Sequence, residues 1–173
     1  MGDTLITIIA IFLAAVLLFV FPMLAISERN DDVAQLQVQV ASEEFINEST
    51  NKGNITQDKY EKFLSRLMAT GNSYDVEMEI QILDENPGKK TTWTSTDKIG
   101  ENLYYSVYTT QIEEQLKKGK YVLKEGDIVT IKVKNTNLTL SQMFKNFFYR
   151  ISGNNTAQIV AEFTGVVSAN GNS

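Results

Sequence analysis

The first part of the chain is apolar without interruption. Residues 5–26 contain no charged side chain, and apolar residues occur on every side of a helix drawn through them. At the helical rise of 1.5 Å per residue, such a helix is about 33 Å long, enough to cross the hydrocarbon core of a bilayer. The pattern therefore predicts a transmembrane segment over residues 1–27.

Two other interpretations fit this stretch less well. A cleaved secretory signal normally has basic residues before an apolar core of about 7–15 residues, but here Asp3 precedes a longer run. A buried core helix of a soluble domain normally keeps one polar face, and residues 5–26 have none. The membrane span is therefore the preferred interpretation.

The pattern becomes amphipathic beyond Arg29, where apolar residues recur every three to five positions with polar residues between them. One helix is thus predicted from about residue 5 to residue 47, about 65 Å long, in which residues 28–48 extend the span. Pro22 removes one backbone hydrogen bond and predicts a local bend. We expect the apolar stripe to pack on a folded domain, the alternative being a free linker. The stripe consists of Val33, Leu36, Val40, Ala41 and Phe45.

Residues 49–168 predict a single α+β head in which a small antiparallel sheet packs against short helices. Helical spacing or capping signals mark helices at 57–68, near 109–116, and from Thr139 or Ser141 to Gly153. Strict alternation marks strands at 74–82, 129–133 and about 157–167, with Gly165 interrupting the last. Residues 47–56 predict a loop, Pro87-Gly88 a turn, residues 89–110 an irregular strand or connection, and residues 169–173 a frayed tail.

Composition limits the chemistry of this head. The chain has no His and no Cys, and no G-x-S-x-G, S-x-x-K or P-loop pattern occurs, so we expect neither an enzyme nor a cofactor. The acids Asp75, Glu77 and Glu79 alternate along one strand, which favours a solvated face over a metal site. A net charge of −5 argues against a nucleic-acid partner. The expected partner is the lipid bilayer.

The distribution of residues around the span suggests an orientation. Arg29 is the only basic residue near residues 5–26, so the positive-inside rule gives little guidance. A short N-terminus before the span and a long acidic remainder after it favour a cytoplasmic N-terminus and an extracellular head. The sequence therefore predicts a single-pass protein of the cell membrane, with a surface filament as a further location.

The whole arrangement resembles the pilins and pseudopilins. An apolar N-terminal helix followed by an exported α+β head is typical of them, and residues 38–80, VQVASEEFINESTNKGNITQDKYEKFLSRLMATGNSYDVEMEI, are similar to TadE-like minor pseudopilins of Tad-type pilus systems in Gram-positive bacteria. The resemblance implies a membrane-anchored minor subunit that takes part in pilus assembly with other pilin-like proteins. The alternative is a tethered extracytoplasmic binding or sensory domain that joins no fibre.

The resemblance also implies roles for individual residues. Gly2 would precede a prepilin-type cleavage that leaves Asp3 as the N-terminus. Thr7 stands where pilins carry a Glu that meets a neighbour's terminal amine, so a minor or non-polymerising role is expected. The expected membrane and assembly surface comprises Leu5, Ile8, Ile9, Phe12, Val16, Phe19 and Pro22. Close approach of helices, or simple contact with lipid, is expected at Ala10, Ala14, Ala15 and Ala25.

Overall fold

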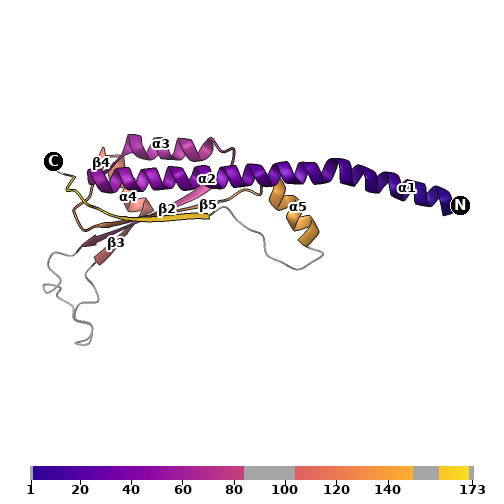
Figure 1. Ribbon diagram of the computed structural model, residues 1–173. Coiled ribbons are helices and arrows are strands. Elements are labelled where there is room, and N and C mark those ends of the chain that lie inside the picture. Colours follow the sequence, from indigo (N-terminus) through magenta and orange to yellow (C-terminus); the bar gives the residue numbers. More distant parts are fainter. Residues whose placement is uncertain (1, 84–103, 150–159, 172–173) are drawn as a thin grey trace, which may run out of the picture.

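The computed structural model describes residues 2–83, 104–149 and 160–171, with the side chains of 147–149 outside that description. It confirms the predicted fold class, because one long N-terminal helix packs on a small antiparallel sheet accompanied by short helices. Figure 1 shows the first half of this helix projecting alone, while the second half lies along the head. The chain is therefore an elongated rod with a head at one end.

The long helix, here called the spine helix, runs from Gly2 to Lys52. It consists of α1 (Gly2–Ala15), a π-helical turn η1 (Val16–Val20) and α2 (Phe21–Lys52). In η1 the widened ladder is closed by a hydrogen bond from the Phe21 N–H to the Val16 carbonyl, directly before Pro22. Because Pro22 has no N–H to donate, the hydrogen bonds of the preceding turn change from the α-helical to the π-helical pattern, close to the position of the predicted bend.

The end of the spine helix differs from the prediction. The helix continues to Lys52, so residues 47–52 are helical and not a loop. Gly53 then ends it in the left-handed conformation, with φ of +62°. That conformation costs glycine little, which explains why the helix stops there and not at the polar residues before it.

The head is built on a four-stranded antiparallel sheet in the order β3-β2-β5-β6. Its strands are β2 (Tyr74–Leu83), β3 (Tyr104–Tyr108), β5 (Ile128–Asn135) and β6 (Val160–Val166). A separate two-stranded ribbon pairs β1 (Asn54–Thr56) with β4 (Lys120–Val122), neither of which the sequence predicted. These three-residue strands are too short to show a periodic pattern, since they are fixed by pairing with each other.

Helices cover one face of the sheet. α2 lies across β5 and β6, α3 (Gln57–Met68) packs beside α2, and α4 (Thr109–Leu116) lies between the sheet and the ribbon (Figure 1). The core between these layers includes Val38, Phe63, Ile80, Ile112 and Ile131, each at most 2% exposed. The other sheet face carries the alternating polar residues, including the Glu77 and Glu79 that the sequence assigned to solvent.

The buried face of α2 corrects the predicted stripe. Ala41 and Phe45 are buried as expected, but Val33, Leu36 and Val40 are 45–60% exposed. The face that meets the head instead combines the apolar Val38, Phe45 and Ile46 with small or polar residues, which let the helix approach the sheet closely. The buried residues of this face are Ala34, Val38, Ala41, Ser42, Phe45, Ile46, Ser49 and Thr50.

The last strand and the C-terminal residues also differ from the prediction. Gly165 does not interrupt β6 but lies within it, paired with Val129. Residues 169–171 are docked and not frayed, because the Gly171 N–H donates to the Leu123 carbonyl at 3.1 Å and Asn170 Oδ1 accepts from the Glu125 N–H at 2.9 Å. The predicted Pro87-Gly88 turn, Trp93, Gly153 and residues 157–159 lie outside the described residues.

The last helix, α5 (Leu140–Tyr149), begins at the predicted cap. Thr139 Oγ1 accepts from the Gln142 N–H at 3.2 Å, and Gln142 Oε1 accepts from the Thr139 N–H at 3.1 Å. This reciprocal capping box satisfies two of the N–H groups that a helix start leaves without partners. α5 leaves the sheet and lies beside α2 at the end of the head nearest to the projecting half of the spine helix (Figure 1).

Candidate functional site: the exposed apolar surface of the spine helix

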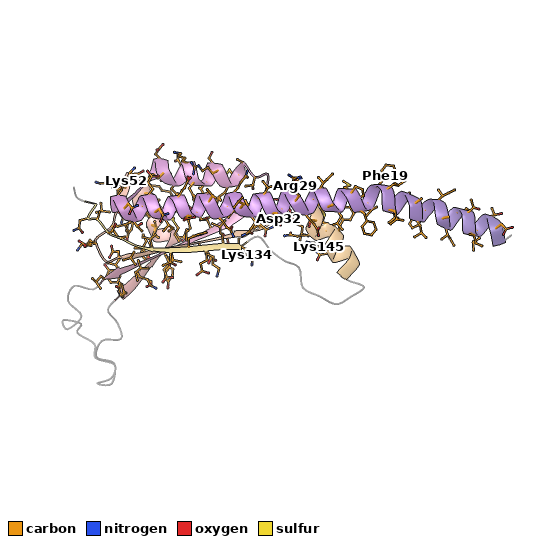
Figure 2. All side chains as sticks on the ribbon, viewed as in Figure 1. Phe19, Arg29, Asp32, Lys52, Lys134 and Lys145 are labelled. Atoms are coloured by element: carbon orange, nitrogen blue, oxygen red, sulfur yellow. The ribbon has the colours of Figure 1, made fainter. Side chains whose placement is uncertain are left out.

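The projecting half of the spine helix is apolar and uncovered. No buried residue belongs to α1 or η1, and side chains stand out from the helix on all sides (Figure 2). Phe19 is 73% exposed and Phe12 is 68% exposed. Because an aromatic side chain costs about 1.5–3 kcal/mol when it is left in water, this surface requires an apolar environment.

The residues that the sequence assigned to the membrane and assembly surface are exposed along the projecting helix. Five of them are 49–73% exposed, Pro22 is exposed, and Val16 is half-exposed. Their spacings of three, four and seven within α1 place them along one side of the helix. The full set is Leu5, Ile8, Ile9, Phe12, Val16, Phe19 and Pro22. The four expected close-approach positions, Ala10, Ala14, Ala15 and Ala25, are exposed as well.

The spine helix is long and apolar enough to cross a membrane, and the apolar window itself is not buried inside the protein. This removes one of the alternatives weighed for the sequence, the core helix covered by its own chain. The sequence predicted a helix of this length and apolarity because both are local properties of the chain.

The first turn of the spine helix satisfies its own polar groups. Gly2 begins α1 and is exposed. Thr7 Oγ1 donates to the Asp3 carbonyl at 2.8 Å, which occupies the hydroxyl within the helix. A hydroxyl that bonds one turn back can lie in an apolar medium without a partner from another chain.

A second apolar surface follows the first and was missed as an exposed feature. Ile26, Val33, Leu36 and Val40, here called the outer stripe, are 45–63% exposed on α2. Their spacings of seven, three and four residues place them on one side of the helix, opposite the face that Val38 and Ser42 present to the head. The outer stripe therefore continues the apolar surface beyond the length of a bilayer span.

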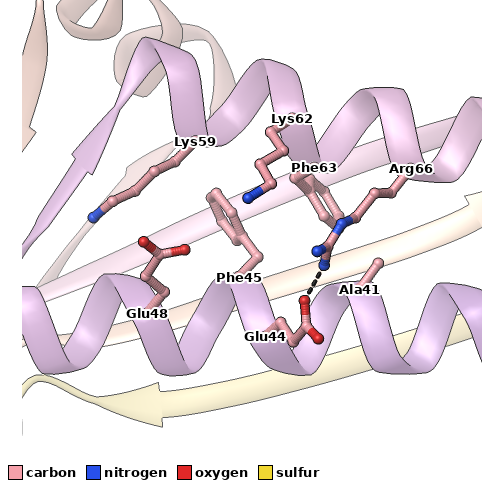
Figure 3. A pocket seen from close by; sticks show the side chains of 8 residues that line it. All are labelled: Ala41, Glu44, Phe45, Glu48, Lys59, Lys62, Phe63 and Arg66. Carbon is pink, nitrogen blue, oxygen red and sulfur yellow. Dashed lines mark hydrogen bonds and ion pairs between the residues drawn. The ribbon is translucent and has the colours of Figure 1, made fainter.

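Another side of α2 packs against α3, and this helix–helix contact is here called the seam (Figure 3). Phe45 and Phe63 stack with ring centroids 4.8 Å apart, and Phe45 also meets Tyr60 at 6.3 Å. Beside them Glu44 forms an ion pair with Arg66, and the pair lines part of a hollow of about 50 Å³. The hollow is small and the ion pair is half-exposed, so aromatic packing dominates the seam.

Neighbouring groups shift the pKa values of two charged side chains along this seam. A hydrogen bond from Lys52 Nζ, at 2.6 Å from Glu48 Oε1, lowers the pKa of Glu48. Partial burial lowers the pKa of Lys59, whose Nζ donates to both the carbonyl and the side-chain oxygen of Asn54.

A hollow larger than the one beside α3 lies on the open face of the sheet. It has a volume of about 390 Å³ and lies between β2, β5, β6 and the start of α4, with Glu77, Glu79, Tyr108, Lys132 and Glu162 among its lining residues. Across the described ranges, no group of three or more His, Cys, Asp or Glu side chains is placed to hold a metal ion. The hollow is shallow and lined by charges of both signs.

No family model matches the chain, and no curated protein or solved structure is significantly similar to it.

Proposed function

We propose that this protein is a membrane-anchored, pilin-like minor subunit that takes part in assembling a Tad-type pilus or a related surface system. In this proposal residues 5–26 cross the cell membrane, the N-terminus is cytoplasmic, and the head is extracellular. The exposed apolar side of the spine helix packs on the spine helices of other pilin-like proteins. The protein acts by binding and carries out no chemical reaction.

The outer stripe is the observation that supports assembly over simple tethering. A tether needs apolar residues only within the hydrocarbon core, which a helix of about 20 residues crosses. Leu36 and Val40 lie ten and fourteen residues beyond Ile26, about 15 and 21 Å along the helix. Their side chains are 60% and 45% exposed on the side away from the head, where a second apolar helix could cover them.

Two features of the N-terminal turns support a minor subunit. Pilins that polymerise regularly are expected to place a carboxylate where this chain has Thr7, and the Thr7 hydroxyl is already bonded to Asp3. Without a buried charge, the apolar surface can pass from lipid to protein without a partner for that position. Processing after Gly2 is part of the proposal, and intact mass of the native protein tests it through the joint loss of Met1 and Gly2.

Substitution of the outer stripe tests the assembly role. We expect Val33→Gln, Leu36→Gln and Val40→Gln together to abolish surface filaments in the native cell, because the helix contact loses its apolar side chains. Glutamine keeps helix propensity, and the three positions lie outside the core, so membrane fractionation and thermal unfolding of the head should not change.

The matched control replaces two exposed polar residues of the same helix, Asp32→Asn and Gln39→Ala, and should leave filaments intact. Filaments at wild-type number in the triple Gln variant would contradict the assembly role. Replacement of residues 5–26 by an unrelated apolar helix is a second test, since full restoration of filaments by such a span would show that residues 5–26 act only as an anchor.

The second candidate function is a tethered extracytoplasmic binding domain. The hollow over Glu79, Lys132 and Glu162 favours it, because a polar sheet face without a covering layer in the described part of the chain is open to a soluble ligand. This function would use the same anchor and leave the outer stripe unused. Normal filaments in a strain that lacks the protein would favour it over assembly.

A further inference from the structure

The apolar and polar sides of α5 are reversed relative to an ordinary surface helix. Ser141 and Gln142 are 0% and 5% exposed, and the capping Thr139 is 7% exposed. In contrast, Leu140 and Met143 are 50% and 46% exposed, and the preceding Leu138 is 59% exposed. Over the described side chains, the start of α5 thus buries polar residues and exposes apolar ones, which line a hollow of about 260 Å³ beside Asn30 and Asp31 of α2. An apolar medium outside the protein would cover them.

The contacts of α5 and its capping residue with α2 show at what distance from the apolar stretch the helix lies. Thr139 Oγ1 donates to Asp31 Oδ2 at 2.7 Å, and Lys145 Nζ lies 3.1 Å from Glu28 Oε1. Glu28 and Asp31 follow the apolar stretch by two and five residues, so they lie about 3 and 8 Å beyond its end along the helix. The headgroup layer of a bilayer extends about 5–8 Å on each side of the hydrocarbon core.

We propose that α5, together with Leu138, is an interfacial helix that inserts its apolar side into the outer leaflet of the bilayer crossed by residues 5–26. This inference rests on the anchor in the proposed function. The occupant is lipid and not a second protein chain, because the polar contacts of Thr139 with Asp31 and of Lys145 with Glu28 lie at the depth of the headgroups. Figure 2 shows Lys145 beside α2 near Arg29 and Asp32, at the start of the projecting helix.

The composition of α5 fits this environment. It has no acidic residue, its one basic residue Lys145 is paired with Glu28, and its exposed Leu140 is a residue type that interfacial helices place on the lipid side. Interfacial helices of this kind immerse their apolar side by about 5–10 Å. A second contact with the bilayer would fix the tilt of the head and hold the outer stripe at a constant angle to the membrane.

Site-specific labelling tests the proposal on the full chain. Because the sequence contains no Cys, each single-Cys variant carries one fluorophore. The variants are Met143→Cys and Leu140→Cys on α5, with Phe19→Cys within the span and Thr164→Cys on the open sheet face as controls. The protein is reconstituted in vesicles of phosphatidylcholine and phosphatidylglycerol, and quenching by nitroxide lipids is compared with quenching by aqueous iodide.

We expect the labels at positions 143 and 140 to be quenched by nitroxide lipids at least about twofold more than the label at position 164, and to be less accessible to iodide. Full iodide access at positions 143 and 140, with lipid quenching at position 19, would overturn the interfacial helix and leave the anchor intact. Protection from both quenchers would also overturn it, because protein would then cover α5. Loss of lipid quenching at position 19 would instead show that the anchor itself has failed.

Discussion

At the scale of single residues, the closest approach between the spine helix and the sheet depends on Gly165. A Cβ at this position would lie 2.6 Å from Ile46 Cγ2 and 3.0 Å from Thr50 Cγ2, which is closer than carbon atoms pack. The sequence suggested a break in β6 because glycine weakens isolated strands. The role of Gly165 depends on a helix more than a hundred residues earlier, so it could not be read from the local pattern.

We expect Gly165→Ala to destabilise the head by about 1–3 kcal/mol, because the added methyl group forces the helix and strand apart. Chemical unfolding followed by circular dichroism measures the change. The exposed neighbour gives the control, since Val166→Ala should change the free energy of unfolding by no more than about 0.5 kcal/mol. The double variant with Ile46→Ala should be less destabilised than the two single changes added together, and strict additivity would contradict the contact.

A second prediction at this scale concerns Tyr60. Burial, together with its hydrogen bond to Glu113 Oε1 at 3.0 Å, raises the pKa of the Tyr60 phenol above its ordinary value. Below about pH 10 the phenol is protonated in both folded and unfolded chains. Above that pH the unfolded chain releases the proton first, so stability is full below pH 10 and falls as the pH rises further.

Tyr60→Phe should therefore reduce the loss of stability above pH 10, measured as the midpoint of chemical unfolding from pH 8 to 11. A remaining slope is expected from Tyr121, whose pKa is also raised by burial. An unchanged slope in the Tyr60→Phe variant would contradict a buried, protonated phenol.

At the scale of elements, the periodicity of apolar residues predicted those helices and strands that bury only one side. β2 and α3 each face one layer, so alternation and helical spacing identified Tyr74–Leu83 and Gln57–Met68 nearly to the residue. α2 carries apolar residues on two sides, and the predicted stripe combined Val33, Leu36 and Val40 from the exposed side with Ala41 and Phe45 from the buried side. The sheet instead takes the side with Ala34, Ala41 and Ser42, because small side chains allow close packing against it.

The same reasoning explains which parts of the candidate site were found. The apolar stretch could be predicted because a helix able to span a membrane is recognised by its length and apolarity alone. The outer stripe and the exposed side of α5 could not be identified, because the apolar residues of α2 and α5 are typical of core helices. The exposure of Leu36 follows only once α2 is placed on the sheet, and that of Met143 only once α5 is placed beside α2.

At the scale of the whole molecule, the projecting half of the spine helix contributes no buried residue to the head. Every buried residue of the spine helix lies at or after Ser27, and α1 and η1 contribute none. The part of α2 that remains after removal of residues 1–26 still buries Val38, Phe45 and Ile46 in the head. A shortened helix begins in water without difficulty, because tertiary packing and not helix propensity holds it.

We therefore expect a chain starting at Ser27 to fold with a free energy of unfolding within about 1 kcal/mol of the detergent-solubilised full chain, and to be released from membranes. The matched variant starts at Ser42 and removes Ala34, Val38 and Ala41 from the core, each of which is at most 5% exposed. That loss should unfold the head, because the free energy lost with several buried side chains exceeds the total free energy of unfolding of a small domain. Equal stability of the two truncated chains would show that α2 does not hold the head together, and failure of the Ser27 chain to fold would show that the projecting half contributes to the head after all.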